Sequence, residues 1–425
     1  MHQANLNFEY TVTRNGSLKF PLYNLNTLPP VVILGSGGLG LIRSLGEKGV
    51  RSIVIDDDDK QLYRNSSRYC RHIIRVPPMD KCPNRTIDAI FSIWHLNCKA
   101  SIPKLVVFPT SDHALVFLLT HWKKVSEFAE IACGPPEVVD ITVDKYKFYL
   151  WLEGNGFPSP KTWFGDAEDE GVGKIGRGIA SFPCIVKPAF THLLERVDGK
   201  KLHIAKDVDH LKRVCERLSK RKMKYIIQEI VPGPVENQFA LAGYSLPGGR
   251  IGCCVITNKL RQSDFGAGTC VSGAFVPGLF ELGKRLISEL KYKGIFEIEF
   301  KRDARDERLK IIELNARSWS QVILATRMRV NVPYMAYCDL AGLCSCERPI
   351  YSKGGRKRYW ISLERDLAVV KEKIGNGGLP VSRLFRQVLT MPTVEPFDLR
   401  DPRPGLLYLK DKLTRFFHKI MRGEK

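Results

Sequence analysis

The sequence predicts a protein of mixed α/β and α+β class, with a parallel α/β domain near its N-terminal end and a larger region of largely antiparallel sheets behind it. Two observations in the 425 residues favour this architecture. A strand, a glycine-rich turn, a helix and a second strand follow one another from residue 31 to residue 56, the order of a parallel βαβ unit. Beyond residue 182, strand-like runs come in hairpin-like pairs, which favours antiparallel pairing.

The predicted α/β domain covers residues 30–134 and follows an N-terminal extension of weak periodicity, residues 1–29. A β-branched run at Val31–Leu34 leads into the glycine turn, and a second strand is expected at Arg51–Ile55. A further buried strand at Lys104–Pro109 ends in polar residues, where α/β sheets place their ligand loops.

The glycine turn by itself suggests one function. Gly35, Gly37 and Gly40 follow a strand in the G-x-G-x-x-G spacing, and Asp56 ends the next strand, so the segment fits a dinucleotide-binding fingerprint. The alternative function is therefore an NAD(P)-dependent oxidoreductase. The same turn also occurs in any Rossmann-like domain whose backbone passes close to something else, so it does not fix the function.

A second region begins near Asp144 with a helix expected at Lys145–Glu153. Its strand candidates alternate in hairpin fashion. They are Pro183–Lys187, Tyr225–Ile230, Gln238–Tyr244, Arg250–Lys259, Gly294–Lys301 and Leu309–Leu314.

The last two of these strands hold the strongest signal. Alternation puts Glu297 and Glu299 on one face of the first strand, and Glu313, Asn315 and Arg317 on one face of the second. A hairpin in this register brings two carboxylates and an amide oxygen to one locus. Such ligands suit Mg²⁺ held jointly with nucleotide phosphates, and the arginine can meet a phosphoryl or carboxylate oxygen. A half-solvated pair of strands with polar residues facing water stays open as the alternative.

These residues resemble a known signature. Phe296-Glu-Ile-Glu-Phe300 followed by Ile312-Glu-Leu-Asn-Ala-Arg317 is similar to the metal-binding motif of the ATP-grasp superfamily, in particular its carboxylate-amine ligases related to D-aspartate ligase. The resemblance implies an ATP-grasp module of two α+β subdomains, one ATP-binding and one Mg-binding, over residues 135–346. It also implies a Rossmann-like domain before the module, and residues 347–425 then form a basic C-terminal extension.

The resemblance further implies roles for individual residues. Two lysines would meet phosphates, a hinge segment would face adenine and one carboxylate would bind ribose: Lys145, Lys187, Gln228, Glu229, Ile230 and Glu236. Glu299, Glu313 and Asn315 would hold Mg²⁺, with Mn²⁺ as an alternative ion, while Arg261 and Arg317 act on the transferring phosphoryl group. The expected phosphate-covering loop, between Phe190 and Asp207, departs from better-known members because it has only one glycine.

The reaction that the resemblance implies is an ATP-dependent ligation. A small-molecule carboxylate is activated as an acyl phosphate and then joined to an amine, with release of ADP and phosphate. Such catalysis consists largely of positioning and charge neutralisation, so it needs no side-chain nucleophile.

The composition of the chain limits which binding partners and which cellular location we expect. The chain has 66 Lys and Arg against 45 Asp and Glu, a formal net charge of +21, which implies attraction to something anionic. No nucleic acid is expected, because no recognised binding module appears. The basic, amphipathic segment Leu406–Lys425 could contact an anionic membrane or dock on its own domain. With no secretory signal and no apolar run of roughly 18 residues, we expect a cytoplasmic protein, and leave open both attachment to the inner membrane face and a homodimer.

Overall fold

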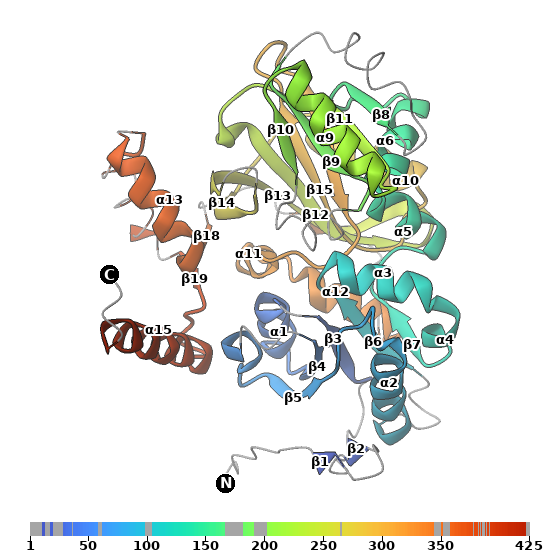
Figure 1. Cartoon of the computed structure of the whole chain (residues 1–425). Coiled ribbons are helices and arrows are strands. Elements are labelled where there is room, and N and C mark those ends of the chain that lie inside the picture. Colours follow the sequence, from blue (N-terminus) through green and yellow to red (C-terminus); the bar gives the residue numbers. More distant parts are fainter. Residues whose placement is uncertain are drawn as a thin grey trace. The chain divides into compact units, whose positions relative to one another are not determined.

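The computed structural model (Figure 1) describes residues 11–12, 18–19, 29–35, 37–57, 62–97, 104–165, 182–190, 202–263, 266–343, 350–351, 358–376, 378–380, 382, 384, 387, 389, 390 and 392–421. The chain divides into two compact units. The N-terminal unit comprises residues 1–133, 317–350 and 358–425, and the central unit comprises residues 134–316 and 351–357. No helix within the described residues is both long and apolar enough to cross a bilayer.

A five-stranded parallel sheet forms the core of the N-terminal unit, in the order β5-β4-β3-β6-β7. The strands are β3 (Val31–Leu34), β4 (Ser52–Asp56), β5 (Cys70–Arg75), β6 (Leu105–Pro109) and β7 (Ala129–Ile131). Strands β3, β4 and β6 are buried along their whole length, as expected of a parallel sheet whose two faces are both covered. The predicted parallel sheet is confirmed.

Within the described part of the chain, four α-helices and one 3₁₀ helix connect the strands of this sheet. They are α1 (Leu39–Gly46), η1 (Leu62–Asn65), α2 (Pro83–Asn97), α3 (Asp112–Thr120) and α4 (Trp122–Ser126). Gly35 and Gly37 both adopt positive φ, of 97° and 93°, in the turn between β3 and α1. Glycine tolerates this backbone conformation without steric cost, which explains the residue type at both positions.

The C-terminal part of the chain also belongs to the N-terminal unit. It contains α11 (Val322–Arg327), α12 (Val332–Leu340), β18 (Tyr359–Ser362), α13 (Leu363–Gly375), β19 (Thr393–Glu395) and α15 (Arg403–Met421). Arg43 of α1 is buried and anchors this segment, donating from Nε to Asp401 Oδ2 at 2.9 Å and from Nη2 to the Pro396 carbonyl at 2.8 Å. The amphipathic segment expected at Leu406–Lys425 lies in α15 as far as Met421, and residues 422–425 lie outside the described residues.

The central unit contains a small and a large sheet. The small sheet has the antiparallel order β10-β9-β11-β8. Its strands are β8 (Thr162–Gly165), β9 (Cys184–Pro188), β10 (His203–Ala205) and β11 (Tyr225–Glu229). Helix α9 (Val208–Lys220) packs on it and buries Leu211, Val214 and Leu218 against Val186 and Ile227.

The large sheet is antiparallel and, within the central unit, has the order β16-β15-β12-β13-β14. Its strands are β12 (Gln238–Leu246), β13 (Arg250–Gln262), β14 (Gly268–Gly273), β15 (Gly294–Arg302) and β16 (Leu309–Asn315). Three other helices, α5 (Pro136–Val143), α6 (Lys145–Gly154) and α10 (Leu279–Glu289), surround the two sheets. Gly283 of α10 lies against Leu241, Ile298 and Phe300 on one face of the large sheet. The opposite face is therefore left to the polar side chains of β15.

Candidate active site

Four polar side chains meet on one face of the hairpin formed by β15 and β16. Glu299 lies directly opposite Glu313, and Glu297 lies opposite Asn315. Directly opposed residues of an antiparallel pair point to the same side of the sheet, so the two pairs share a face. The hairpin register expected from the sequence is confirmed: Glu299 lies beside Glu313, and Asn315 lies two residues further along the same strand.

Glu297 belongs to this cluster, although the predicted ligand set left it out. Asn315 Nδ2 donates a hydrogen bond to Glu297 Oε2 at 3.1 Å, and both side chains are buried. The bond holds the amide with its nitrogen edge toward Glu297. Alternation already placed Glu297 beside Glu299, but it did not distinguish a carboxylate that orients the amide from one that binds a cation.

Two lysines from other elements neutralise the paired carboxylates. Lys259 Nζ of β13 lies 2.8 Å from Glu299 Oε2, and Lys145, the first residue of α6, forms an ion pair with Glu313. Burial alone would lower the pKa of Lys259, but the charge of Glu299 and its neighbours outweighs burial and raises it. Asp144 caps α6 by accepting backbone hydrogen bonds, which fixes Lys145 at the start of the helix.

Lys187 lies on β9 of the small sheet and donates from Nζ to Gln228 Oε1 at 2.9 Å. Burial, aided by the nearby charge of Lys145, lowers the pKa of Lys187 to about 8 against the opposing effect of Glu313. An ammonium that loses its proton so easily is stabilised by any added negative charge. A phosphate placed here would supply such charge.

The end of β11 holds a compact network of charges around Glu229. Its carboxylate accepts from Lys310 Nζ at 2.7 Å, from the Lys161 N–H at 3.0 Å and from Arg305 Nη2 at 2.8 Å. Asp303 pairs with the same Lys310 and Arg305 side chains. Burial would raise the pKa of Glu229, but these hydrogen bonds outweigh it and lower the pKa. The carboxylate is therefore ionised and fully engaged.

The other predicted adenine and ribose contacts follow β11. Ile230 comes directly after the strand and is half-buried. Glu236 lies in η2 (Val235–Asn237), where its carbonyl accepts from Asn258 Nδ2 at 2.7 Å. Burial lowers the pKa of Lys301 and the charge of Glu236 opposes that shift.

The two predicted catalytic arginines lie in different units. Arg261 of β13 is two residues beyond Lys259 and is 2% exposed. Arg317 belongs to the N-terminal unit, where its Nε lies 2.6 Å from Asp112 Oδ1. Strand β16 ends at Asn315, so the alternation that was expected to place Arg317 on the same strand face stops before reaching it, and that expectation is wrong.

The donor set on the hairpin fits a hard divalent cation. Two carboxylates and one amide oxygen are ligands that Mg²⁺ accepts, and Mg²⁺ usually takes its remaining ligands from water and substrate phosphates. Across the residues that the structure describes, no three His, Cys, Asp or Glu side chains form a metal-binding group. A cation on Glu299, Glu313 and Asn315 would thus depend on phosphate oxygens to complete its coordination.

The glycine turn of the N-terminal unit has a different environment from the one that a dinucleotide needs. Asp56 is 1% exposed, and its Oδ2 accepts from Asn65 Nδ2 at 2.8 Å and from Arg75 Nη1 at 3.1 Å. A ribose-binding acid would have to present its oxygens to the ligand. Asp56 is instead an internal ion-pair partner, which disfavours the oxidoreductase alternative.

Comparison with known proteins gives similarity in structure alone. No family model and no curated protein matches the sequence. The chain is similar to an N5-carboxyaminoimidazole synthetase from Staphylococcus aureus complexed with ADP, with 13% identity over 77% of this chain and 81% of that one and a TM-score of 0.57. It is also similar to a biotin carboxylase from Campylobacter jejuni, with 15% identity, 74% and 71% coverage and a TM-score of 0.55.

A third similar structure is an L-amino acid ligase from Bacillus licheniformis, with 14% identity, 76% and 78% coverage and a TM-score of 0.54. These structures share the ATP-grasp fold, and the present chain has that fold. The resemblance expected from the sequence motif is confirmed at the level of the fold.

Proposed function

We propose that this protein is an ATP-dependent carboxylate-amine ligase. It activates a carboxylate as an acyl phosphate with MgATP and joins it to an amine, releasing ADP and phosphate. The supporting observation is the hairpin of the central unit, which sets Glu299 opposite Glu313 and places Asn315 on the same face, with Lys145 and Lys259 already bound to the two carboxylates.

The triphosphate would enter a site rich in both signs of charge. In this proposal Lys145 and Lys187 contact phosphate oxygens, and Mg²⁺ joins the triphosphate to Glu299, Glu313 and Asn315. Lys145 now neutralises Glu313, so binding would exchange one ion pair for two: the cation takes the carboxylate and the lysine takes a phosphate.

The remaining contacts follow the same assignment. Adenine would lie at the Gln228–Ile230 segment, which spans the end of β11 beside the strand that holds Lys187, and ribose at Glu236, which follows in η2. Arg261 and Arg317 would stabilise charge on the transferring phosphoryl group, because a guanidinium can match phosphoryl oxygens with two hydrogen bonds.

The substrates in this proposal are small molecules. Similar structures include an L-amino acid ligase and two enzymes named for carboxylation or carboxyamino chemistry, so a small carboxylate and an amine are the pair we propose. The oxidoreductase alternative lacks this support, because its acid, Asp56, is buried in an ion pair.

The test is an ADP-release assay with Mg²⁺ in which amino acids and small amines are screened in pairs. Glu313→Ala should lower the rate by about 100-fold, since it removes one of two anionic ligands from the transition-state cation. Glu307→Ala is the matched control, because Glu307 is an exposed glutamate in the loop of the same hairpin. ADP release that survives Glu313→Ala undiminished would rule out the metal assignment.

A second proposal concerns location. Leu406, Leu409 and Leu413 of α15 are 63%, 45% and 56% exposed, and Lys410 beside them is also exposed. An exposed apolar stripe bordered by cations, in a chain of net charge +21, suits the surface of an anionic membrane. We therefore propose a cytoplasmic enzyme whose C-terminal helix makes peripheral membrane contact.

A further inference from the structure

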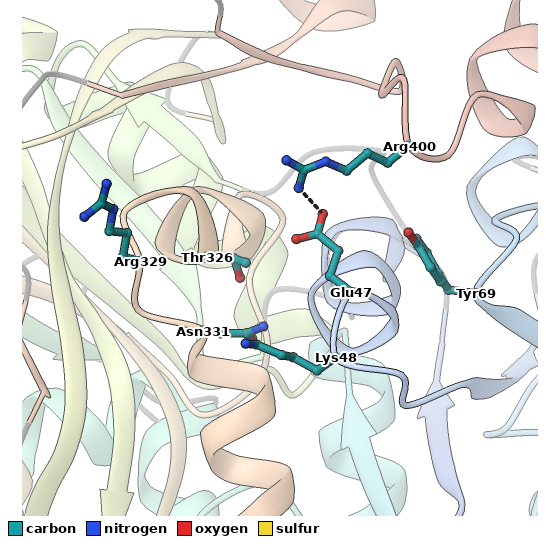
Figure 2. Close-up of a pocket in the computed structure, with 7 residues that line it drawn as sticks. All are labelled: Glu47, Lys48, Tyr69, Thr326, Arg329, Asn331 and Arg400. Atoms are coloured by element: carbon teal, nitrogen blue, oxygen red, sulfur yellow. Dashed lines mark ion pairs between the residues drawn. The ribbon is translucent and has the colours of Figure 1, made fainter.

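The N-terminal unit contains a pocket of about 500 Å³ that has no part in the proposed ligase site. It lies where the end of α1, the segment joining α11 to α12 and the residues before α15 come together (Figure 2). Seven residues line it: Glu47, Lys48, Tyr69, Thr326, Arg329, Asn331 and Arg400.

The floor of the pocket is fixed by hydrogen bonds. Asn331 donates from Nδ2 to the Ser44 carbonyl at 2.7 Å, while its Oδ1 caps α12. Thr326 and Ser44 share a hydroxyl hydrogen bond of 2.8 Å. The Tyr69 ring, which also lines the pocket, packs closely on α1, since a Cβ on Gly46 would lie only 2.1 Å from it. The polar floor is thus rigid and its groups have partners within the protein.

Glu47 is the acidic member of the lining set, and its charge is already compensated. Arg327 holds it in a bidentate pair, with Nη1 2.8 Å from Oε2 and Nη2 2.7 Å from Oε1. Arg327 Nη2 also donates to Asp398 at 2.9 Å. Because Arg327 pairs with Glu47, the sign of the charge in the pocket is set by its other lining side chains.

Three exposed cations are among the lining residues: Lys48, Arg329 and Arg400. Arg400 Nη1 reaches Glu47 Oε1 only at 3.5 Å, the pair drawn as a dashed line in Figure 2. Among the described residues, no ion pair holds Arg329. With three cations and one carboxylate in its lining, the pocket has an excess of two positive charges, and the charge of the adjoining Arg327 is balanced by Asp398.

We propose that this pocket binds a small, multiply charged anion of the phosphate or polyphosphate class. Two guanidinium groups offer the planar pairs of N–H donors that match phosphate oxygens, and an ammonium adds a third charge. The volume is that of an ordinary small-molecule site. The inference does not depend on the ligase proposal, because every lining residue belongs to the N-terminal unit.

Inorganic pyrophosphate is the probe, and isothermal calorimetry at low ionic strength without Mg²⁺ is the measurement. The reference protein carries Lys187→Ala, which weakens phosphate contacts in the central unit. Adding Arg329→Ala or Arg400→Ala should each weaken pyrophosphate binding by about tenfold, the usual worth of one charge-assisted contact. The positive φ of 69° at Arg329 should cost the wild-type arginine and the alanine replacement about the same strain, because both residues carry a Cβ.

Arg51→Ala provides the matched control. It removes one exposed arginine of the same unit from outside the lining set and should leave the affinity nearly unchanged. Glu47→Gln should act in the opposite direction and tighten binding several-fold, with a melting curve to show that the variant is folded.

Three results would overturn the proposal. They are no pyrophosphate binding in the Lys187→Ala reference, equal binding in the reference and in both pocket variants, or an equal loss in the Arg51→Ala control. The first would show that the intact pocket does not bind pyrophosphate, the second that the two arginines do not contribute to binding, and the third that the effect depends only on overall charge.

Discussion

Lys187 is the side chain whose ionisation should govern nucleotide affinity. Burial and the neighbouring Lys145 lower its pKa to about 8, so it loses its proton within an accessible pH range. Bound phosphate favours the charged form and would raise that pKa again. We predict that MgATP affinity falls as pH rises above about 8, by up to tenfold per pH unit, when measured by calorimetry.

Lys187→Arg tests this assignment, because a guanidinium stays charged throughout the range. Its MgATP affinity should be independent of pH where the wild-type affinity falls. A parallel fall in the arginine variant would assign the titration to another group.

The lowered pKa of Lys187 also affects the stability of the protein. The native chain binds fewer protons than the unfolded chain between pH 8 and the normal lysine pKa of 10.5, so this residue adds stability as pH rises through that window.

The candidate site was only partly predictable from the sequence. Glu299, Glu313 and Asn315 belong to one hairpin, so alternation and a short loop were enough to bring them together. The partners Lys145 and Lys259 lie 168 and 40 positions from their carboxylates, and no local pattern encodes such pairs. Tyr149, whose hydroxyl donates to the Ile312 carbonyl behind the site, gave no signal for the same reason.

At the scale of elements, α10 supports the site from the far face of its sheet. A Cβ on Gly283 would lie 2.4 Å from Leu241 Cδ2, and Ile298 and Phe300 are the next neighbours. We predict that Gly283→Ala destabilises the protein by about 1–3 kcal/mol in urea unfolding, because overpacking here outweighs the better helix propensity of alanine.

Gly154, the last residue of α6, is the control for that substitution. A Cβ there meets nothing within 4 Å, so Gly154→Ala should be neutral or stabilise by up to about 1 kcal/mol. If the two alanine variants had the same stability, close packing of α10 on the sheet would not be what selects glycine.

Helix α15 offers a separate test. We predict that the protein sediments with vesicles containing phosphatidylglycerol and much less with phosphatidylcholine alone, because exposed cations meet the anionic headgroups. Leu409→Glu should weaken this binding by about tenfold or more, since a buried leucine contributes about 1.5–3 kcal/mol.

Leu367→Glu is the matched control for the membrane experiment. Leu367 is 59% exposed on α13 of the same unit and lies outside α15, so its replacement adds the same charge elsewhere. An equal loss of vesicle binding in the two variants, or binding that does not depend on lipid charge, would indicate that α15 does not face the membrane.

Strand positions were more predictable than strand partners. The run expected at Gly294–Lys301 is β15 with one residue added, and the one expected at Arg250–Lys259 extends to Gln262 in β13. Alternation and β-branched composition mark such elements locally. The pairing of β12 with β13 follows from the short turn between them, but the pairing of β12 with β15 could not be read in that way, because it depends on which distant strand completes the buried face.

At the scale of the whole molecule, the chain order does not follow the two units. Residues 317–350 and 358–425 return to the unit that begins the chain, and buried Arg43 holds residues Pro396 and Asp401 there. Composition alone suggested a basic extension, because nothing local to residues 396–401 shows that they satisfy an arginine more than 350 positions earlier.

The division into units gives the last prediction. A nucleotide that binds native central-unit strands should slow their amide exchange, since opening then also requires ligand release. We predict that MgATP protects β9, β11, β15 and β16 in hydrogen-exchange mass spectrometry, while NAD⁺ protects no segment. Glu313→Ala should abolish the MgATP effect on β15 and β16. Protection centred instead on the turn from Gly35 to Gly40 would return the nucleotide to the N-terminal unit, because only a ligand held there would order that backbone directly.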